Sequence, residues 1–483
     1  MSLIKKNFLY NLSYQILTII LPIITIPYVS RVLGPENIGV YSYTLSIANY
    51  FLLFSLLGVK NYGSRTIAQS NKHSDQINKR FWEIYFFQVS VSVIMVILYL
   101  IYIVLFQKDY TFIAIIQLII VLSAAFDISW FYFGIEKFKL TAIRGIVIRV
   151  LGVALIFILV SEPSDLWLYV LIMASTTFFS QLALWPFLFK YVRFVKPTLY
   201  NIKKHIKPNL LLFIPVISIS FYNIMDKVMV GQLSTMTQLG FYENTERITT
   251  VPFSVVIALG TVMIPRMSNL ISKGEYIKNK IYIKKSMKYI IFLGSAISFG
   301  IGAVAPTFAP VFFGDEFFPV STLMTVMSPI IIFKAWASVI RTQYLIPTSR
   351  DKEYVSSVIF GAIVNLIINF LLISSLGALG AVIGTIIAEF VVAAYQTIVV
   401  RKELEIVNYF KMNIVFILNG LIMLLIIRKI DVYLTINFLS LAIEILLGAF
   451  IYLILSIGYL YILKDEIIMR YANKIKLSVK NLL

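Results

Sequence analysis

The sequence predicts an all-α integral membrane protein with about 14 transmembrane helices. Of its 483 residues, 59% are hydrophobic and only 13% are charged, which is far too apolar for a water-soluble chain of this length. Apolar runs of roughly 20 residues, long enough to cross a bilayer, recur from end to end. Basic residues gather in every second connection between these runs, as they do in proteins that cross a membrane repeatedly.

The predicted spans follow one another with short connections. We expect them at 9–30, 38–58, 82–106, 111–133, 145–161, 166–189, 208–230, 246–265, 289–312, 319–340, 354–375, 378–400, 412–427 and 438–463. No connection exceeds about 25 residues, which leaves no room for an extracellular catalytic domain. The sequence also lacks the G-x-x-x-x-G-K-[ST] motif of phosphate-binding loops, and its first outer loop offers only Glu36 as a carboxylate. We therefore expect a protein that is not an enzyme.

The basic residues also predict an orientation. If the N-terminus lies inside the cell, 34 of the 42 Lys and Arg residues fall in inner segments and few of the others in outer ones. Both termini are therefore expected to be cytoplasmic. The net charge of +19 then reflects orientation and contact with anionic lipid headgroups rather than nucleic-acid binding. Because the chain has no cysteine, disulfides and thiolate metal sites are excluded, and we expect no metal or cofactor.

A weak internal repeat relates the two halves of the chain. The sequence reads I-G-V-Y at 38–41 and L-G-F-Y at 239–242, an offset of 201 residues or six spans. An even number of spans keeps the orientation of the halves the same, so we expect parallel repeats with a substrate site between them. Spans thirteen and fourteen fall outside the repeat. The predicted domains are 1–200, 201–405 and 406–483.

Polar side chains recur at helical spacing in several spans. These sets are Ser218, Tyr222 and Asp226; Lys334, Ser338 and Arg341; Gly361, Asn365 and Asn369; and Thr385, Glu389 and Gln396. Each set either lines a water-filled cleft or packs one helix against another, and the sequence leaves both alternatives open for any one set.

Ionisable residues deep within apolar helices are the strongest candidates for function. A central Arg, Lys or Asp costs ~2.5–3.5 kcal/mol on insertion scales, which several aliphatic neighbours offset, so insertion alone does not prove a role. Asp226 and Lys227 are adjacent in the seventh span, and Lys334 lies well inside the tenth. Asp226 and Lys227 serve either a polar cleft or structural ion pairs with other helices. Glu389 is either a site for a coupling ion or a buried carboxyl bonded to an amide.

The arginines lie closer to helix ends, where simpler roles compete. Arg149 is near enough to the inner end of its span for its side chain to reach the lipid headgroups, and Arg31 and Arg341 stand where anchoring to the membrane surface is the ordinary role. Arg247 opens the eighth span beside acidic residues that suit a helix N-terminus.

Five short motifs occur in an order that resembles one known family. They read R-V-L-G-P-E-N-I-G-V-Y-S-Y (31–43), D-I-S-W-F-Y-F-G-I-E-K-F-K (127–139), D-K-V-M-V-G (226–231), L-G-F-Y-E-N-T-E-R-I (239–248) and L-G-A-L-G-A-V-I-G-T-I-I-A-E (376–389). Over nearly its whole length the chain resembles the polysaccharide-repeat (Wzx-type) flippases of the multidrug/oligosaccharidyl-lipid/polysaccharide exporter superfamily. The resemblance implies two six-helix lobes around a central cavity, plus two C-terminal helices.

The resemblance also implies a function. Such a flippase moves an undecaprenyl-pyrophosphate-linked oligosaccharide repeat unit from the inner to the outer leaflet of the bacterial plasma membrane, for capsule, O-antigen or exopolysaccharide assembly. A polysaccharide polymerase and a chain-length regulator are expected partners. The family's cationic cavity residues carry over to Arg31, Arg149, Lys227, Arg247, Lys334 and Arg341 as the substrate-binding set. We expect Asp226 and Glu389 to couple transport to a proton or sodium gradient. A lipid II flippase and a multidrug/cation antiporter of the same superfamily are the alternatives.

Overall fold

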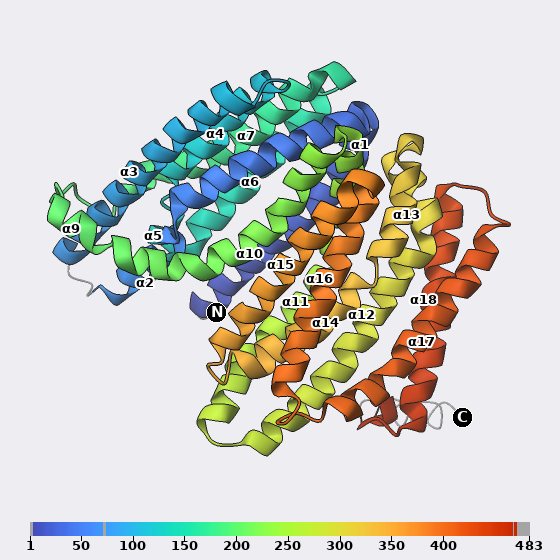
Figure 1. The fold of residues 1–483 in the computed structure, drawn as a ribbon. Coiled ribbons are helices and arrows are strands. Elements are labelled where there is room, and N and C mark those ends of the chain that lie inside the picture. The colour runs from blue at the N-terminus through green and yellow to red at the C-terminus, as the bar shows by residue number, and fades with distance from the viewer. Residues whose placement is uncertain (1–2, 71–73, 467, 471–483) are drawn as a thin grey trace, which may run out of the picture. The chain divides into compact units, whose positions relative to one another are not determined.

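The protein is built from helices that form two compact units. The computed structural model describes residues 3–70, 74–466 and 468–470, and no strand occurs within these ranges (Figure 1). The first unit is Met1–Glu243 and the second is Asn244–Leu483, so that the boundary falls inside helix α11. The all-α class predicted from the apolar runs is confirmed.

The first unit contains α1 to α10 and the start of α11. Its helices are α1 (Leu3–Leu56), α2 (Val59–Gln69), α3 (Ser74–Phe106), α4 (Thr111–Phe126), α5 (Ser129–Gly134), α6 (Phe138–Leu159), α7 (Leu166–Leu182), α8 (Trp185–Leu188), α9 (Leu199–Lys204) and α10 (Ile206–Leu233). Helix α4 packs against α1, α3 and α7, whereas α10 packs along α1 and α2. The domain boundary predicted at residue 200 came from the repeat and stays a prediction; α10, which follows it, packs with the helices before it.

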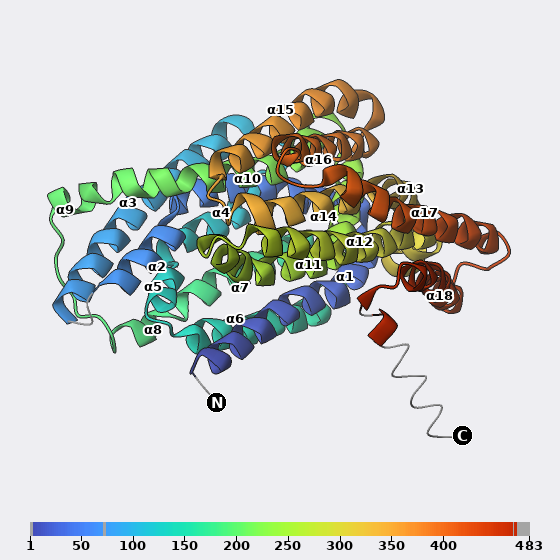
Figure 2. The same ribbon diagram turned by 90° about the horizontal axis from the view of Figure 1, so that it is seen from below.

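The second unit contains the rest of α11 and seven further α-helices. They are α11 (Met236–Ser272), α12 (Tyr276–Phe313), α13 (Phe318–Met327), α14 (Ile330–Ile340), α15 (Asp351–Leu376), α16 (Ala378–Val400), α17 (Ile406–Asp431) and α18 (Phe438–Ile462). A π-helical turn, Arg341–Leu345, extends α14. Helices α15 and α16 form a tightly packed hairpin, and α17 and α18 pack against α12 (Figure 2).

All fourteen predicted spans fall on helices, but two of them share α1. At ~1.5 Å per residue, its 54 residues would measure about 80 Å, far more than the ~30 Å of a hydrocarbon layer. The helix is broken at Gly34, whose φ of 73° is a left-handed conformation that suits glycine, and Pro35 starts the next segment. The break therefore separates the predicted spans 9–30 and 38–58.

The number of crossings is smaller when each helix is judged by length and composition. Among the described residues, eleven helices are long and apolar enough to cross a membrane, or twelve if α13 and α14, which meet at a 43° bend, count as one span. The predicted count of fourteen is therefore not confirmed. Part of the difference arises at α1, which is one helix with two predicted spans, and at α10, where several side chains lie outside the described residues.

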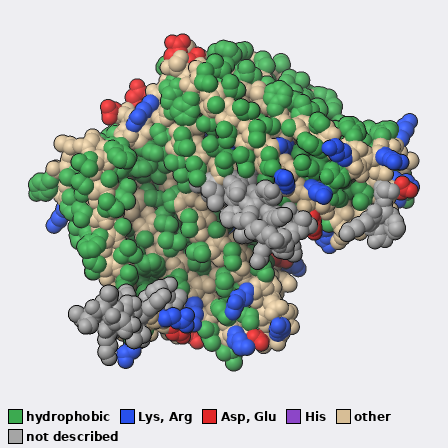
Figure 3. Space-filling view, turned by 180° about the vertical axis from the view of Figure 1, so that it is seen from behind, with side chains coloured by type: hydrophobic (Ala, Val, Ile, Leu, Met, Phe, Trp, Pro, Cys, Tyr) green, Lys and Arg blue, Asp and Glu red, His purple; other side chains and the backbone are tan. Residues whose placement is uncertain are grey.

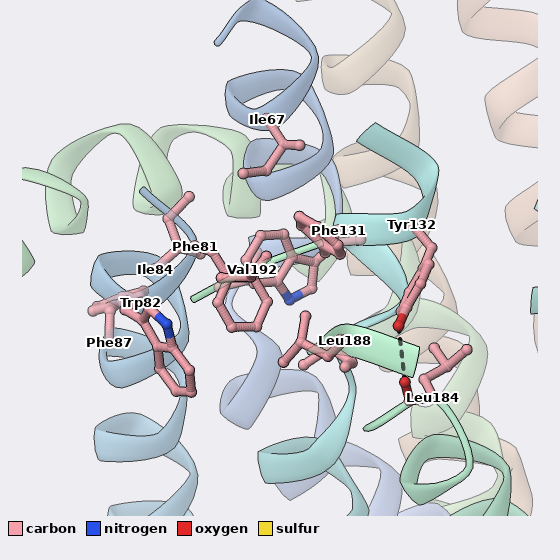
Figure 4. Close-up of a cluster of buried hydrophobic side chains, with 13 residues drawn as sticks. Ile67, Phe81, Trp82, Ile84, Phe87, Phe131, Tyr132, Leu184, Leu188 and Val192 are labelled. Carbon is pink, nitrogen blue, oxygen red and sulfur yellow. Dashed lines mark hydrogen bonds between the residues drawn. The ribbon is translucent and has the colours of Figure 1, made fainter. Parts of the chain in front are cut away.

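An aromatic core holds one end of the first unit together. Thirteen buried residues from the segments around α2, α3, α5 and α8 form it, including Phe81, Trp130 and Phe131 (Figure 4). The Tyr132 hydroxyl donates to the Leu184 carbonyl at 2.8 Å, so this buried hydroxyl has a hydrogen-bond partner within the core. The motif W-F-Y-F-G at 130–134 is thus largely a packing element, not the wall of a cleft.

Large apolar side chains cover the outside of many helices. The face drawn in Figure 3 is rich in hydrophobic side chains. Exposed apolar residues, such as Ile97 on α3 and Phe450 on α18, lie along helices that are long and apolar enough to cross a membrane. Exposed apolar surface of this extent is costly in water and favourable in lipid. The structure is that of a multi-pass membrane protein.

Candidate functional site

A cluster of polar and charged residues lies in the first unit where α1, α10 and the start of α11 meet. It consists of Ser42 from α1, Asp226 and Lys227 from α10, and Tyr242 and Glu243 from α11, which we call the α10 cluster. The two sequence candidates of the seventh span, Asp226 and Lys227, are therefore both present in it.

Each carboxylate of the α10 cluster has a different partner. The Lys227 ammonium lies 2.8 Å from Glu243 Oε2, and the Ser42 hydroxyl donates to the same oxygen at 2.7 Å. The Tyr242 hydroxyl donates to Asp226 Oδ2 at 2.7 Å. Hydrogen bonds to an ionised partner are shorter and stronger than neutral ones, so these contacts fix both carboxylates.

The α10 cluster is buried except at its cation. The Lys227 side chain is 20% exposed, whereas that of Glu243 is 6% exposed. Asp226 and Tyr242 are also buried. Of the ion pair, the lysine side chain is therefore the more accessible member. This arrangement is a partly exposed lysine held in place by a buried carboxylate.

Two glycines of the repeat explain how α1 and α11 approach so closely. A Cβ on Gly39 would lie 1.8 Å from the Met236 carbonyl oxygen, and a Cβ on Gly240 would lie 1.9 Å from the Pro35 carbonyl oxygen. Both contacts relate residues at the repeat offset, because Gly39 corresponds to Gly240 and Pro35 to Met236. The Ser42–Glu243 hydrogen bond joins repeat equivalents as well. The sequence repeat is therefore expressed as a local two-fold contact within the first unit.

A second ion pair lies in the second unit. The Lys334 ammonium on α14 is 3.5 Å from Glu389 Oε1 on α16, and their side chains are 29% and 12% exposed. The Phe253 ring centroid lies 5.9 Å from the same ammonium, at the limit of cation–π attraction. This pair is longer and more exposed than the Lys227–Glu243 pair. Neither alternative predicted for Glu389 foresaw that its neighbour is a lysine.

The four arginines of the predicted substrate-binding set have different surroundings. Arg31 on α1 and Arg149 on α6 are exposed, and Arg247 on α11 is half-buried. Arg341 begins the π-helical turn after α14 and lies over the Tyr354 ring, 5.5 Å from its centroid. Within the second unit, Lys334 and Arg341 thus occupy one helix and its extension, while their substrate role stays a prediction.

One predicted polar set packs helices together. Asn365 and Asn369 are buried between α15 and α16, and the Asn369 amide donates to the Asn365 oxygen at 3.2 Å. A Cβ on Gly361 would lie 2.5 Å from Val392 on α16, which shows how close the two helices are. This set therefore follows the packing alternative. The side chains of Ser218 and Tyr222, by contrast, lie outside the described residues.

Three residues of the site escaped prediction from the sequence as a group. Ser42, Tyr242 and Glu243 were not assigned to a common cluster with Asp226. A signal was available, because Ser42 and Glu243 differ by the same 201 residues as the I-G-V-Y and L-G-F-Y motifs. In the described part of the chain, no group of three or more His, Cys, Asp or Glu residues is arranged to hold a metal ion.

Comparison with known families assigns the chain. A family described as polysaccharide biosynthesis protein matches residues 4–271, which is more than half of the sequence. The chain belongs to the polysaccharide biosynthesis protein family. The resemblance carried by the five motifs is thereby confirmed.

Two relatives of this polysaccharide biosynthesis protein are named as candidate O-antigen transporters. The one from Escherichia coli (strain K12) is 22% identical over 405 residues, covering 83% of this chain and 97% of the relative. The one from Shigella dysenteriae is 25% identical over 402 residues, covering 81% of this chain and 98% of the relative.

A solved structure is similar over nearly the whole fold. The lipid II flippase MurJ, in an inward closed conformation, has a TM-score of 0.79 and 16% sequence identity, covering 95% of this chain and 100% of that chain. At this identity the likeness concerns the fold alone. It confirms an all-helical membrane architecture for this member of the family.

Proposed function

We propose that this polysaccharide biosynthesis protein is a flippase for an undecaprenyl-pyrophosphate-linked oligosaccharide repeat unit. It would move the unit from the inner to the outer leaflet of the bacterial plasma membrane. The observation that carries the proposal is the Lys227 side chain, which is 20% exposed and lies within an apolar helix of a chain from this family. The names of the relatives describe transport rather than catalysis, which supports a protein that is not an enzyme.

The physical difficulty of the reaction is the headgroup. A pyrophosphate and its sugars cannot enter hydrocarbon unaided, because ions lose their hydration there at very high cost. Lysine and arginine side chains replace the lost water by charge-assisted hydrogen bonds. Lys227 is held by Glu243 and Lys334 by Glu389, so a diphosphate would bind at either lysine by competing with its carboxylate for the ammonium group. Arg31, Arg149, Arg247 and Arg341 complete the proposed binding set.

The same exchange suggests how an ion gradient is coupled to transport. A carboxylate whose ammonium partner has turned to the substrate attracts another cation more strongly. Glu389 would then bind a proton or sodium ion, and Asp226, bonded to Tyr242, would be the second coupling residue. Release of that cation on the other side would return the carboxylate to its lysine and expel the substrate.

The flipped unit would then serve the assembly of a polysaccharide outside the plasma membrane. With both termini in the cytoplasm, the flipped unit would be delivered to the outer leaflet, where a polysaccharide polymerase and a chain-length regulator would act on it. Capsule, O-antigen and exopolysaccharide assembly are the processes that need such a step.

A flipping assay in proteoliposomes tests the proposal. The purified chain is reconstituted with a labelled undecaprenyl-pyrophosphate oligosaccharide, and the fraction of label reached by an impermeant reagent is followed with time. We expect Lys227→Gln and Lys334→Gln to slow flipping at least about tenfold, the equivalent of ~1.4 kcal/mol of lost substrate interaction, whereas Lys411→Gln, which changes an exposed lysine of α17, leaves it unchanged. Equal rates in all three variants would refute the cationic site.

The alternatives are tested in the same vesicles. Lipid II as the labelled substrate tests the lipid II flippase. A lipophilic cation as substrate tests the multidrug antiporter. Faster transport of either one than of the oligosaccharide carrier would replace the proposed substrate.

A further inference from the structure

A buried carboxyl group lies among the helices outside the repeat. Glu444 on α18 has no exposed surface. Its Oε1 atom lies 2.7 Å from the Thr307 hydroxyl on α12, while Oε2 is buried and no N–H or hydroxyl donor reaches it in the part of the chain that is described. The Asp431 carboxyl on α17 also lies within hydrogen-bond range of the Glu444 carboxyl. An ionised carboxylate would keep this charged oxygen buried and unsatisfied, which is among the costliest arrangements in a protein interior.

The hydrogen bonds around Thr307 can be counted. Its oxygen lies 2.7 Å from Glu444 Oε1 and 2.9 Å from Asp431 Oδ1 on α17. A threonine hydroxyl has one proton, so it donates to one carboxyl and must accept from the other. An ionised carboxylate only accepts. If both carboxyls were ionised, one of the two short oxygen–oxygen contacts would have no proton in it.

Burial decides which carboxyl carries the additional proton. Glu444 is completely buried, whereas Asp431 is half-buried at the end of α17. Arg428, one turn before Asp431, donates to the Gly302 carbonyl and to Thr325 and interacts electrostatically with both carboxyls. The charged form is favoured where water and a cation are at hand. The proton therefore belongs on Glu444, and the negative charge on Asp431.

We propose that Glu444 is a proton-binding site that exchanges its proton through Thr307 and Asp431. In the loaded state, Glu444 O–H donates to Thr307, and Thr307 O–H donates to Asp431. On release, Glu444 passes its proton to Thr307 while Thr307 passes its own to Asp431, which gives it to water. Glu444 and Asp431 are then both anions on either side of one hydroxyl.

Proton binding at this site controls how α18 is attached. The loaded chain of hydrogen bonds joins α12, α17 and α18, and their apolar contact is the cluster that includes Ala303, Met423 and Tyr452. Loss of the proton places two like charges on α17 and α18, which repel. The Glu444 site is separate from Asp226 and Glu389. Its proton binding does not depend on which substrate the protein transports.

Infrared spectroscopy of the full-length chain in lipid nanodiscs tests the proposal. We expect a C=O stretching band of a protonated carboxylic acid at neutral pH that is lost in Glu444→Gln and kept in Asp431→Asn. Thr307→Val should shift this band, since it removes the hydroxyl that accepts from Glu444, and should slow its hydrogen–deuterium exchange. A Glu444→Gln spectrum that matches the wild type at every pH would overturn the assignment.

A second measurement does not depend on the spectrum. The folded protein keeps the Glu444 proton to a higher pH than the unfolded chain does. The thermal midpoint of the wild type should therefore fall with rising pH until the folded protein has lost this proton as well. Glu444→Gln, a neutral side chain of the same shape, should fold and lack that decline. If sodium at constant pH replaces the proton and removes the band, the site binds a metal cation and the proposal fails. Flipping rates do not enter either measurement, so failure here is distinct from failure of the proposed flippase.

Discussion

The Lys227–Glu243 pair can be tested as a coupled unit by a double-mutant cycle. The perturbations are Lys227→Met, which removes the ammonium but keeps the chain length, and Glu243→Gln, which removes the charge but keeps the shape. Because adjacent charges in a buried cluster depend on each other, the two changes together should cost less than their sum.

The magnitudes follow from the burial of each side chain. Lys227→Met leaves the Glu243 carboxylate, 6% exposed, with Ser42 but without its cation, and removal of one partner from a buried pair costs about 3–5 kcal/mol. Glu243→Gln keeps an acceptor for Ser42 and leaves a lysine side chain that is 20% exposed, so we expect a cost of about 1–2 kcal/mol. The double variant strands neither charge, and its cost should resemble that of Glu243→Gln alone. The coupling then equals the cost of Lys227→Met alone, about 3–5 kcal/mol.

Unfolding of the detergent-solubilised protein measures these values. Tryptophan fluorescence, from the five tryptophans of the chain, would follow denaturant unfolding of the wild type, the two single variants and the double variant. Lys411→Met and Glu316→Gln, which change exposed residues far apart in sequence, supply a control cycle. If the losses in the Lys227 and Glu243 variants simply add, the two side chains are not coupled, and the account of the α10 cluster is wrong.

Three further predictions concern other parts of the structure. Gly39→Ala should lower the unfolding free energy by at least about 1–3 kcal/mol, because its Cβ would meet backbone, whereas Gly458→Ala, which has open space around it, should not; thermal unfolding compares them. Burial lowers the pKa of His205 below 6.5 more than Glu83 raises it, so the folded state binds fewer protons than the unfolded chain and stability should fall as the pH drops below about 6.5. His205→Gln should flatten that pH profile, and an unchanged slope would contradict the assignment. Burial raises the pKa of Asp465, but hydrogen bonds from Lys288 and Tyr289 outweigh burial and hold this pKa below 3.8. The ionised Asp465 therefore stabilises the fold above pH 3.8, and this stabilisation is lost as the pH falls further. Asp465→Asn should reduce the loss of stability in acid and should cost about 1–3 kcal/mol near neutrality.

The helices were predictable because each apolar run carries its own signal. A run of about 20 apolar residues becomes a helix in lipid whatever its neighbours are, since its backbone must satisfy its own hydrogen bonds. The apolar runs do not predict where one helix breaks, bends or extends beyond its apolar part. The break at Gly34 and the bend between α13 and α14 depend on local backbone geometry, and α12 starts at Tyr276, well before the apolar run that marked its span.

The candidate site was predictable only in part. Asp226, Lys227 and Lys334 stood out because a charge within an apolar helix is rare. Their partners Glu243 and Glu389 come from other helices, and periodicity within one helix carries no information about which helix lies opposite. The same limitation applies to Asn365 and Asn369, whose spacing fits a cleft wall and a packing seam equally well, and which the structure places against α16.

The paired glycines at Gly39 and Gly240 have a consequence for how such a protein tolerates change. In a symmetric dimer encoded by one gene, any substitution at an isologous contact strikes both copies at once. Here the two equivalent contacts are formed by different residues of one polypeptide, so one contact can be changed while the other stays intact. A substitution at Gly39 therefore leaves the close approach at Gly240 in place, and that contact continues to hold α1 and α11 together.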